Sequence, residues 1–199
     1  MSSRMHGSEE ALATLAFQRV RVADSLVVLI GGLGMGFTLR AALDRLPPGA
    51  AVVVAELLPA VVAWNRGVLG PLAAHPLKDR RVTIQIGDVL EILEGSRARF
   101  DAVMLDVDNG PAAFTSTENA RLYGDAGLVA ARTALKPGGV LAVWSAWEDR
   151  KFEQRLRHHG FSVATERVRA RLKRGGPRHT IFLATTAPDS ARRESRAPR

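Results

Sequence analysis

The amino-acid sequence predicts an α/β domain built on a seven-stranded, mainly parallel sheet that closes with an antiparallel β-hairpin. Short apolar runs rich in valine alternate along the chain with segments whose apolar residues recur at helical spacing. Such alternation is typical of parallel sheets that helices cover on both faces. The last two apolar runs are joined by a short turn around Gly175-Gly176-Pro177. These two strands are expected to pair antiparallel, because a parallel return needs a longer crossover.

The elements follow one another in a regular order. Ser8 is expected to cap an opening helix that continues to about Arg19, with Glu9 and Glu10 in its first turn favouring the helix dipole. Seven strands are predicted at 26–31, 51–56, 81–86, 100–106, 140–145, 161–171 and 179–186. Helices are predicted after the first five strands, at 37–46, 59–69, 89–94, 118–135 and 148–159. The sequence Lys136-Pro137-Gly138-Gly139 is expected to stop the fourth of these helices.

The length and composition suit one domain, because 199 residues with 46% hydrophobic content are ample for one α/β unit and short for two. We expect an N-terminal segment and helix over 1–24, the main domain over 25–187, and a disordered basic tail over 188–199. The absence of cysteine excludes disulfides, thiolate metal sites and a cysteine nucleophile. No hydrophobic signal region or membrane-length apolar stretch is found, so a cytoplasmic protein without membrane contact is expected.

A glycine-rich loop follows the first predicted strand and precedes a predicted helix. Its glycines Gly32, Gly34 and Gly36 let a ligand approach the backbone closely. The dinucleotide-binding fingerprint fails, because Phe37 or Leu39 stands where its third glycine would be. The G-x-G-x-G form instead resembles the nucleoside loop of S-adenosylmethionine-type transferases.

Two acidic residues lie at the carboxyl ends of the next two predicted strands. Glu56 lies twenty residues beyond Gly36, where a carboxylate can accept hydrogen bonds from both ribose hydroxyls. Asp88 follows the third strand and precedes a helical segment. Together with the glycines these acids predict a bound adenosine-containing ligand; the alternative is that Glu56 and Asp88 only cap helices.

The fourth predicted strand is followed by Asp106, Asp108 and Asn109, where the group that accepts the transfer is expected to lie. Two neighbouring carboxylates raise one another's pKa, which makes one of them a better base toward an ammonium group. Asp106 and Asp108 are therefore the catalytic candidates, and Asn109 is a candidate substrate ligand. In the alternative interpretation, residues 108–110 form a turn that supplies only backbone geometry.

Aromatic residues near the same edge are further candidates. Trp147 follows the fifth predicted strand, where its ring could stack on adenine or attract a sulfonium cation. Trp144 is interpreted as a core residue. Tyr123 lies beyond the acidic loop and could either line the acceptor pocket or pack its helix.

The net charge of +8 is concentrated in two places, the tail and the segment from Glu166 to Arg178, which holds six basic residues and one acid. There Arg167, Arg169 and Arg171 alternate with apolar residues, which favours an edge strand protected by charge over an RNA-binding ribbon. Nucleic acid stays the less favoured partner, a small-molecule amine is the favoured one, and a homodimer is left open.

Together, Val28–Arg40, Glu56, Gly87-Asp88, Asp106–Pro111 and Ala134–Gly139 resemble the spermidine synthase (polyamine aminopropyltransferase) family. The similarity runs from about Ser25 to Ser145. The resemblance implies the class I methyltransferase fold, a Rossmann-like architecture, with no metal. It also implies that Asp106 deprotonates the attacking amine, that Glu56 holds the ribose and that Asp88 meets the adenine side.

Three departures from the family pattern leave the reaction open. The glycine loop lacks the family's acid, which helps to hold the aminopropyl end of decarboxylated S-adenosylmethionine. Asn109 stands where the family has an Asp that grips the polyamine. The family's amino-terminal hairpin domain is missing, which indicates a truncated start or a divergent relative, although Ser3–Glu9 is similar to the family's segment that enters the domain.

The expected activity is alkyl transfer to an amine from decarboxylated S-adenosylmethionine or S-adenosylmethionine, moving an aminopropyl or else a methyl group. Two alternatives are kept. One is an S-adenosylmethionine-dependent methyltransferase that acts on RNA or a small molecule. The other is a non-catalytic nucleoside-binding relative that has the fold without the chemistry.

Overall fold

A computed structural model of the chain describes residues 5–107, 110–111, 121–171 and 176–188. Its central element is a mixed sheet whose strands are β1 (Val27–Gly31), β2 (Ala51–Glu56), β3 (Val82–Ile86), β4 (Phe100–Leu105), β5 (Leu135–Ser145), β6 (Ser162–Arg169) and β7 (Arg178–Thr185). The strands lie in the order β3-β2-β1-β4-β5-β7-β6. Strands β1 to β5 pair in parallel, and β7 pairs antiparallel with both β5 and β6. The predicted fold class is therefore confirmed.

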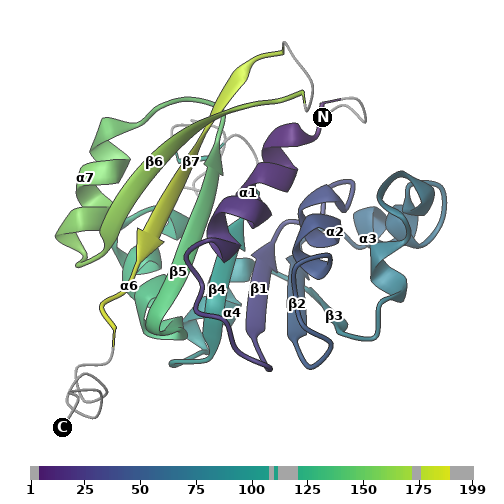
Figure 1. Cartoon of the computed structure of the whole chain (residues 1–199), viewed down its shortest axis with the longest axis horizontal. Coiled ribbons are helices and arrows are strands. Elements are labelled where there is room, and N and C mark those ends of the chain that lie inside the picture. Colours follow the sequence, from purple (N-terminus) through teal and green to yellow (C-terminus); the bar gives the residue numbers. More distant parts are fainter. Residues whose placement is uncertain (1–4, 108–109, 112–120, 172–175, 189–199) are drawn as a thin grey trace, which may run out of the picture.

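Helices cover both faces of the sheet, as Figure 1 shows. They are α1 (Gly7–Phe17), α2 (Phe37–Leu43), α3 (Pro59–Arg66), α4 (Val89–Glu94), α6 (Asp125–Ala134) and α7 (Arg150–His158), with short 3-10 turns η1 (Gly70–Ala73) and η2 (Pro76–Lys78). Two apolar clusters follow from this layering. One packs α1, α2 and α3 on one face of the sheet, and the other packs α4, α6 and α7 on the opposite face.

Alternation along the strands assigns neighbouring residues to different layers. In β1, Val28 and Ile30 are fully buried in the cluster beneath α1 and α2, whereas Leu29 is fully buried in the cluster beneath α4 and α6. Strands buried on both faces read as continuous apolar runs, which is why their positions were evident from the sequence.

The start of α1 differs from the prediction. The helix begins at Gly7, with His6 at its N-cap position, and no side chain caps it. Ser8 lies inside the first turn and is fully buried, and its hydroxyl donates to Oε2 of Glu9 at 2.8 Å. The predicted Ser8 cap is therefore wrong, because the helix begins one residue earlier and the Ser8 hydroxyl contacts Glu9 and His179 instead.

The segment between α6 and β5 also differs from the prediction. Residues 136–139 were expected to stop the helix ahead of a strand that starts at 140; the helix does end before them, at Ala134, but β5 begins at Leu135 and includes them. A register shift opposite Phe100 and Ala102 accommodates the extra residues. The backbone of Gly138 donates to Ala187 at 3.0 Å, and the carbonyl of Gly139 accepts from Thr186 at 3.0 Å. Pairing with the chain that leaves β7 thus extends the strand.

The ends of several other helices and strands differ from the predicted ends by a few residues. Helix α3 ends at Arg66 and is followed by the two 3-10 turns, so the predicted helix to 69 was too long. Helix α6 begins at Asp125; of the earlier part of that predicted helix, 118–120 lie outside the described residues and 121–124 precede α6. Strand β6 lies at the edge of the sheet, as predicted from its alternating charges. No helix in the described parts of the chain is long and apolar enough to span a membrane.

Candidate functional site

The glycine loop connects β1 to α2 at the carboxyl edge of the parallel strands. Gly32 and Gly36 adopt φ angles of 87° and 82°, which residues with a side chain rarely adopt. A Cβ atom at Gly32 would overlap the carbonyl oxygen of Asp106. The backbone N–H of Asp106 in turn donates to the carbonyl of Gly31 at 2.9 Å. The loop and the chain after β4 are therefore in direct contact.

Asn65 on α3 anchors the middle of this loop. Its Nδ2 donates to the carbonyl of Gly34 at 2.8 Å and to the carbonyl of Val61 at 2.9 Å, and the side chain is almost fully buried. Its Oδ1 lies 3.1 Å from where a Cβ of Gly36 would be. Sequence reasoning missed Asn65, because a lone asparagine within a helix carries no signal of a partner 31 residues earlier.

Glu56 ends β2 and links the loop to the start of α3. Its Oε2 accepts from the N–H of Leu33 at 2.9 Å, and its Oε1 accepts from the N–H of Leu58 at 3.0 Å. Only 8% of the residue is exposed. Each carboxylate oxygen can accept more than one hydrogen bond, so ligand hydroxyls can still bind here. Glu56 thus contacts the loop directly, and its role toward ribose stays a prediction.

Asp88 occupies the N-cap of α4, where its Oδ1 accepts from the N–H of Leu90 at 2.9 Å. This contact is the capping alternative considered from the sequence, and it leaves the second oxygen for another donor. Two apolar side chains at the same edge, Leu57 and Ile86, are 57% and 53% exposed. They offer an apolar surface beside Glu56 and Asp88.

Asp106 follows β4 and is engaged by α2. Its Oδ2 accepts from the hydroxyl of Thr38 at 2.7 Å. The pKa of Asp106 is raised from 3.8 to about 6, chiefly because burial disfavours the charged carboxylate. The hydrogen bond from Thr38 acts in the opposite direction, and the nearby negative charge of Glu9 adds to the rise. The carboxyl group therefore changes its charge close to neutral pH.

The first turn of α1 lies beside Asp106. Besides its contact with Glu9, the Ser8 hydroxyl lies 2.9 Å from Nδ1 of His179 on β7. Burial lowers the pKa of His179, which favours its neutral imidazole. His6 stacks on the ring of Phe37 with centroids 4.1 Å apart. The described part of the segment that resembles the family's entry into the domain, from Met5 to Glu9, thus lies at the predicted site.

The aromatic residues considered from the sequence differ in their burial and contacts. Tyr123 is buried, packs edge-on against Phe152, and its hydroxyl lies 3.5 Å from the carbonyl of Val107. Trp144 packs against His179 with centroids 4.6 Å apart, whereas Trp147 is 56% exposed. Asp108 and Asn109 lie outside the described residues, as does the tail from 189 onward.

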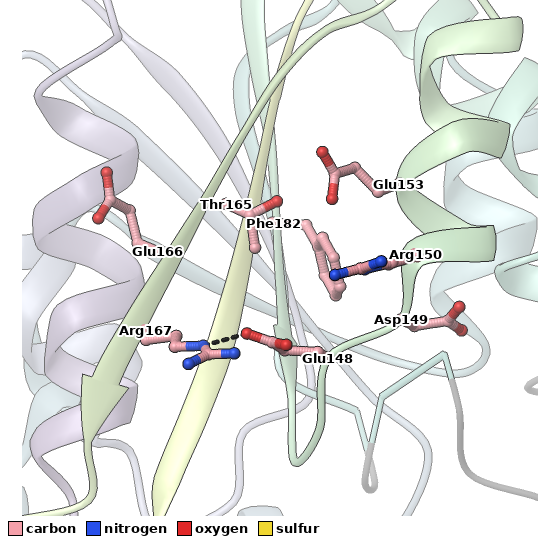
Figure 2. A pocket seen from close by; sticks show the side chains of 8 residues that line it. All are labelled: Glu148, Asp149, Arg150, Glu153, Thr165, Glu166, Arg167 and Phe182. Carbon is pink, nitrogen blue, oxygen red and sulfur yellow. Dashed lines mark hydrogen bonds and ion pairs between the residues drawn. The ribbon is translucent and has the colours of Figure 1, made fainter.

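A cavity of about 560 Å³ lies elsewhere, between the start of α7 and the hairpin. Figure 2 shows the side chains that line it: Glu148, Asp149, Arg150, Glu153, Thr165, Glu166, Arg167 and Phe182. Its acids have partners, because Glu148 pairs with Arg167 and Glu153 pairs with Arg157. None of the residues around the glycine loop lines this cavity, so the cavity is separate from the candidate site at the loop.

The described residues form no cluster of three or more His, Asp or Glu side chains that could hold a metal ion.

The sequence-family model of the spermine/spermidine synthase domain matches residues 5–162 of the chain. A search of the curated proteins found no match.

Three solved structures illustrate the fold. A spermidine synthase in complex with the transition-state analogue AdoDATO and the spermidine synthase of Thermotoga maritima are each 19% identical, with TM-scores of 0.69. Both matches cover 92% of this chain but only 59% and 61% of those chains. Human methyltransferase-like protein 13 in complex with SAH is 20% identical, with a TM-score of 0.65 and coverage of 97% and 94%. The chain thus spans about three fifths of the length of the matched spermidine synthases.

Proposed function

The chain belongs to the spermine/spermidine synthase domain family, and from that premise we propose that it transfers an alkyl group from an S-adenosylmethionine-type sulfonium nucleoside to a small-molecule amine. One observation carries the proposal. Asp106, whose backbone carbonyl lies against Gly32 of the glycine loop, carries a partly buried carboxyl group with a pKa near 6, and this group can take a proton from an acceptor bound next to the nucleoside.

The donor side fits a nucleoside. Gly32 and Gly36, at φ angles that favour glycine, shape the turn of the loop, and the carboxylate of Glu56 borders it. A carboxylate at this strand end can accept hydrogen bonds from two ribose hydroxyls. Leu57 and Ile86 supply exposed apolar surface against which the adenine ring can pack. Two of the similar structures hold AdoDATO and SAH, which supports a ligand of this class here.

The acceptor side fits a proton transfer coupled to displacement. An ammonium group gives its proton to Asp106, and the freed nitrogen lone pair attacks the carbon next to sulfur. The carbon–nitrogen bond forms as the carbon–sulfur bond breaks, and the neutral thioether leaves with the bonding electrons. At pH 7 a group with a pKa of about 6 is mostly ionised, yet more basic than an ordinary aspartate. The site also aligns the two reactants.

Aminopropyl transfer is the first candidate reaction because of the family. Methyl transfer is the second, and a specific observation favours it: Leu33 and Met35 carry no carboxylate that could hold the ammonium of an aminopropyl group. In the structure Leu33 is buried and its backbone is held by Glu56. The two reactions therefore differ in the donor nucleoside that is used: decarboxylated S-adenosylmethionine for aminopropyl transfer and S-adenosylmethionine for methyl transfer.

Mass spectrometry of reaction products tests the proposal. The full chain is incubated separately with S-adenosylmethionine and with its decarboxylated form, each with a set of diamines and triamines. We expect the acceptor to gain an aminopropyl or a methyl group, and the Asp106→Asn variant to lose most of this activity. If either nucleoside binds but no amine is modified, the chain is a nucleoside-binding relative without this chemistry.

A further inference from the structure

Thr38 is a buried polar residue of the first turn of α2, and its hydroxyl points away from its own helix. The residue is 3% exposed. Its Oγ1 lies 2.7 Å from Oδ2 of Asp106, which is 68 positions later in the sequence. A second and longer contact, of 3.4 Å, joins the same hydroxyl to the carbonyl of Glu9. The hydroxyl thus lies between α1 and the end of β4.

A threonine within a helix can donate to the carbonyl four residues before it. Thr14 on α1 does so, with its hydroxyl 2.8 Å from the carbonyl of Glu10. For Thr38 the corresponding carbonyl belongs to Gly34, and Nδ2 of Asn65 already donates to it at 2.8 Å. Thr38 is the second residue of α2 and Gly34 precedes the helix, so no earlier helical turn offers its hydroxyl a carbonyl, and the hydroxyl donates to Asp106 instead.

We propose that Thr38 is a positioning residue that holds Asp106 through Oδ2, fixing the orientation and protonation of the carboxyl group and leaving Oδ1 to meet the acceptor amine. The role in transfer rests on the proposed function. Among the residues that the structure describes, no donor contacts Oδ1 of Asp106. A carboxylate pinned through one oxygen presents the other at a defined place, which favours alignment with the attacking nitrogen.

The electrostatic effect has a definite sign. A hydrogen bond donated to a carboxylate stabilises its charged form and lowers its pKa. Burial and the charge of Glu9 on α1 raise the pKa of Asp106, and within the described residues these are the opposing influences. Removing the Thr38 hydroxyl would therefore raise the pKa above 6 and leave a smaller fraction of Asp106 ionised at neutral pH.

The experiment compares Thr38→Val with Thr38→Ser and Thr14→Val. Thr38→Val keeps the shape and removes the hydroxyl, Thr38→Ser keeps the hydroxyl, and Thr14→Val removes a hydroxyl that bonds only within its own helix. In the Thr38→Val variant we expect the acid limb of the kcat profile to move to higher pH by about one unit. The KM for the nucleoside should stay within about twofold. The other two variants should keep the wild-type acid limb.

A second measurement does not depend on turnover. The Asp106 carboxyl is followed by 13C NMR across pH in the wild type, Thr38→Val and Thr38→Ala, with Asp106→Asn to assign the signal. The midpoint should move to higher pH in both variants that lack the hydroxyl. Thr38→Ala serves if the valine variant does not fold.

The outcomes separate the two proposals. An acid limb and an NMR midpoint that both stay unchanged without the hydroxyl would overturn the positioning role of Thr38, even if the enzyme transfers an alkyl group. A midpoint that moves in a protein that modifies no amine would support the contact between Thr38 and Asp106 and overturn the proposed transfer.

Discussion

At the carboxyl ends of β1, β2 and β4 the charged side chains that the structure describes are few and at least partly buried, whereas along β6 and β7 they are many and exposed. Glu56 and Asp106 are held by donors from the glycine loop and α2. On the hairpin, Arg167 pairs with exposed Glu148, and Arg169 lies directly opposite Arg178. The hairpin supplies much of the net charge, and the strand ends supply the chemical candidates.

The difference shows that the density of charge along a sequence is a poor guide to reactivity. An exposed ion pair contributes little free energy, because solvent screens it. A single carboxyl group that is buried and hydrogen-bonded has its pKa displaced instead, and displaced pKa values are typical of functional sites. The comparison predicts large effects from substitutions at the strand ends and small ones from substitutions on the hairpin.

The largest expected effect comes from Asp106→Asn, which keeps the shape of the side chain and removes its basicity. Turnover should fall by about a hundredfold or more, and nucleoside affinity should change by only a few fold. Wild-type activity should be lost as the pH falls through about 6, since the base becomes protonated. Steady-state kinetics across pH, with the exposed Asp44→Asn as control, measure this. Normal turnover of the variant at neutral pH would rule out the base role.

The same substitution should stabilise the fold. The pKa of Asp106 is higher in the folded protein than its ordinary value of 3.8, so the folded state binds the proton more tightly. The protonated Asp106 carboxyl therefore contributes fully to stability below about pH 4, and this contribution is lost as the pH rises through 6. At pH 7 the Asp106→Asn variant should gain up to about 3 kcal/mol in the free energy of unfolding. Urea denaturation at several pH values tests this, and parallel curves for variant and wild type would contradict it.

Glu56→Ala should weaken nucleoside binding at least about tenfold. The substitution would remove the charge-assisted hydrogen bonds expected between Glu56 and the ribose, each contributing roughly 1.5 to 3 kcal/mol, and it frees the backbone N–H of Leu33. Calorimetric titration with sulfonium nucleosides and their products measures the affinity. Glu94→Ala, at the exposed end of α4, is the matched control. Unchanged affinity for every such nucleoside would remove the ribose assignment.

The smallest effect is expected on the hairpin. Replacing Arg167, Arg169 and Arg171 with Gln should leave turnover of a small amine within about twofold, because charges on an edge strand serve mainly to prevent pairing with other chains. The measurement is the same kinetic assay. If turnover disappears while the fold and nucleoside binding persist, the hairpin belongs to the acceptor site, and the chemistry is not confined to the strand ends.

The sheet could be predicted from sequence because its strands are apolar on both faces. The bounds of β2 match the prediction at both ends, Ala51 and Glu56. The extension of β5 to Leu135 could not be predicted, since Pro137 and two glycines locally favour a turn and only pairing with residues 186 and 187 overrides that preference.

Within the candidate site, sequence reasoning placed the glycines, Glu56 and Asp106 at neighbouring strand ends, and the structure brings them together through backbone contacts. It missed Thr38 and Asn65, because a short polar residue in a helix next to apolar neighbours carries no sign of a distant partner. Such pairings depend on tertiary geometry. The roles assigned to Asp108 and Asn109 stay predictions, since these residues lie outside the described part of the chain.

The tight contact at Gly32 sets how this site can change through mutation. No side chain fits there, because even a methyl group would overlap the backbone of Asp106. In a saturation library over the loop, position 32 should therefore return glycine alone, whereas the partly exposed Met35 should tolerate many residues. Adaptation to a different donor would then proceed through position 35. We therefore expect glycine to be kept at position 32 while other residues of the loop change.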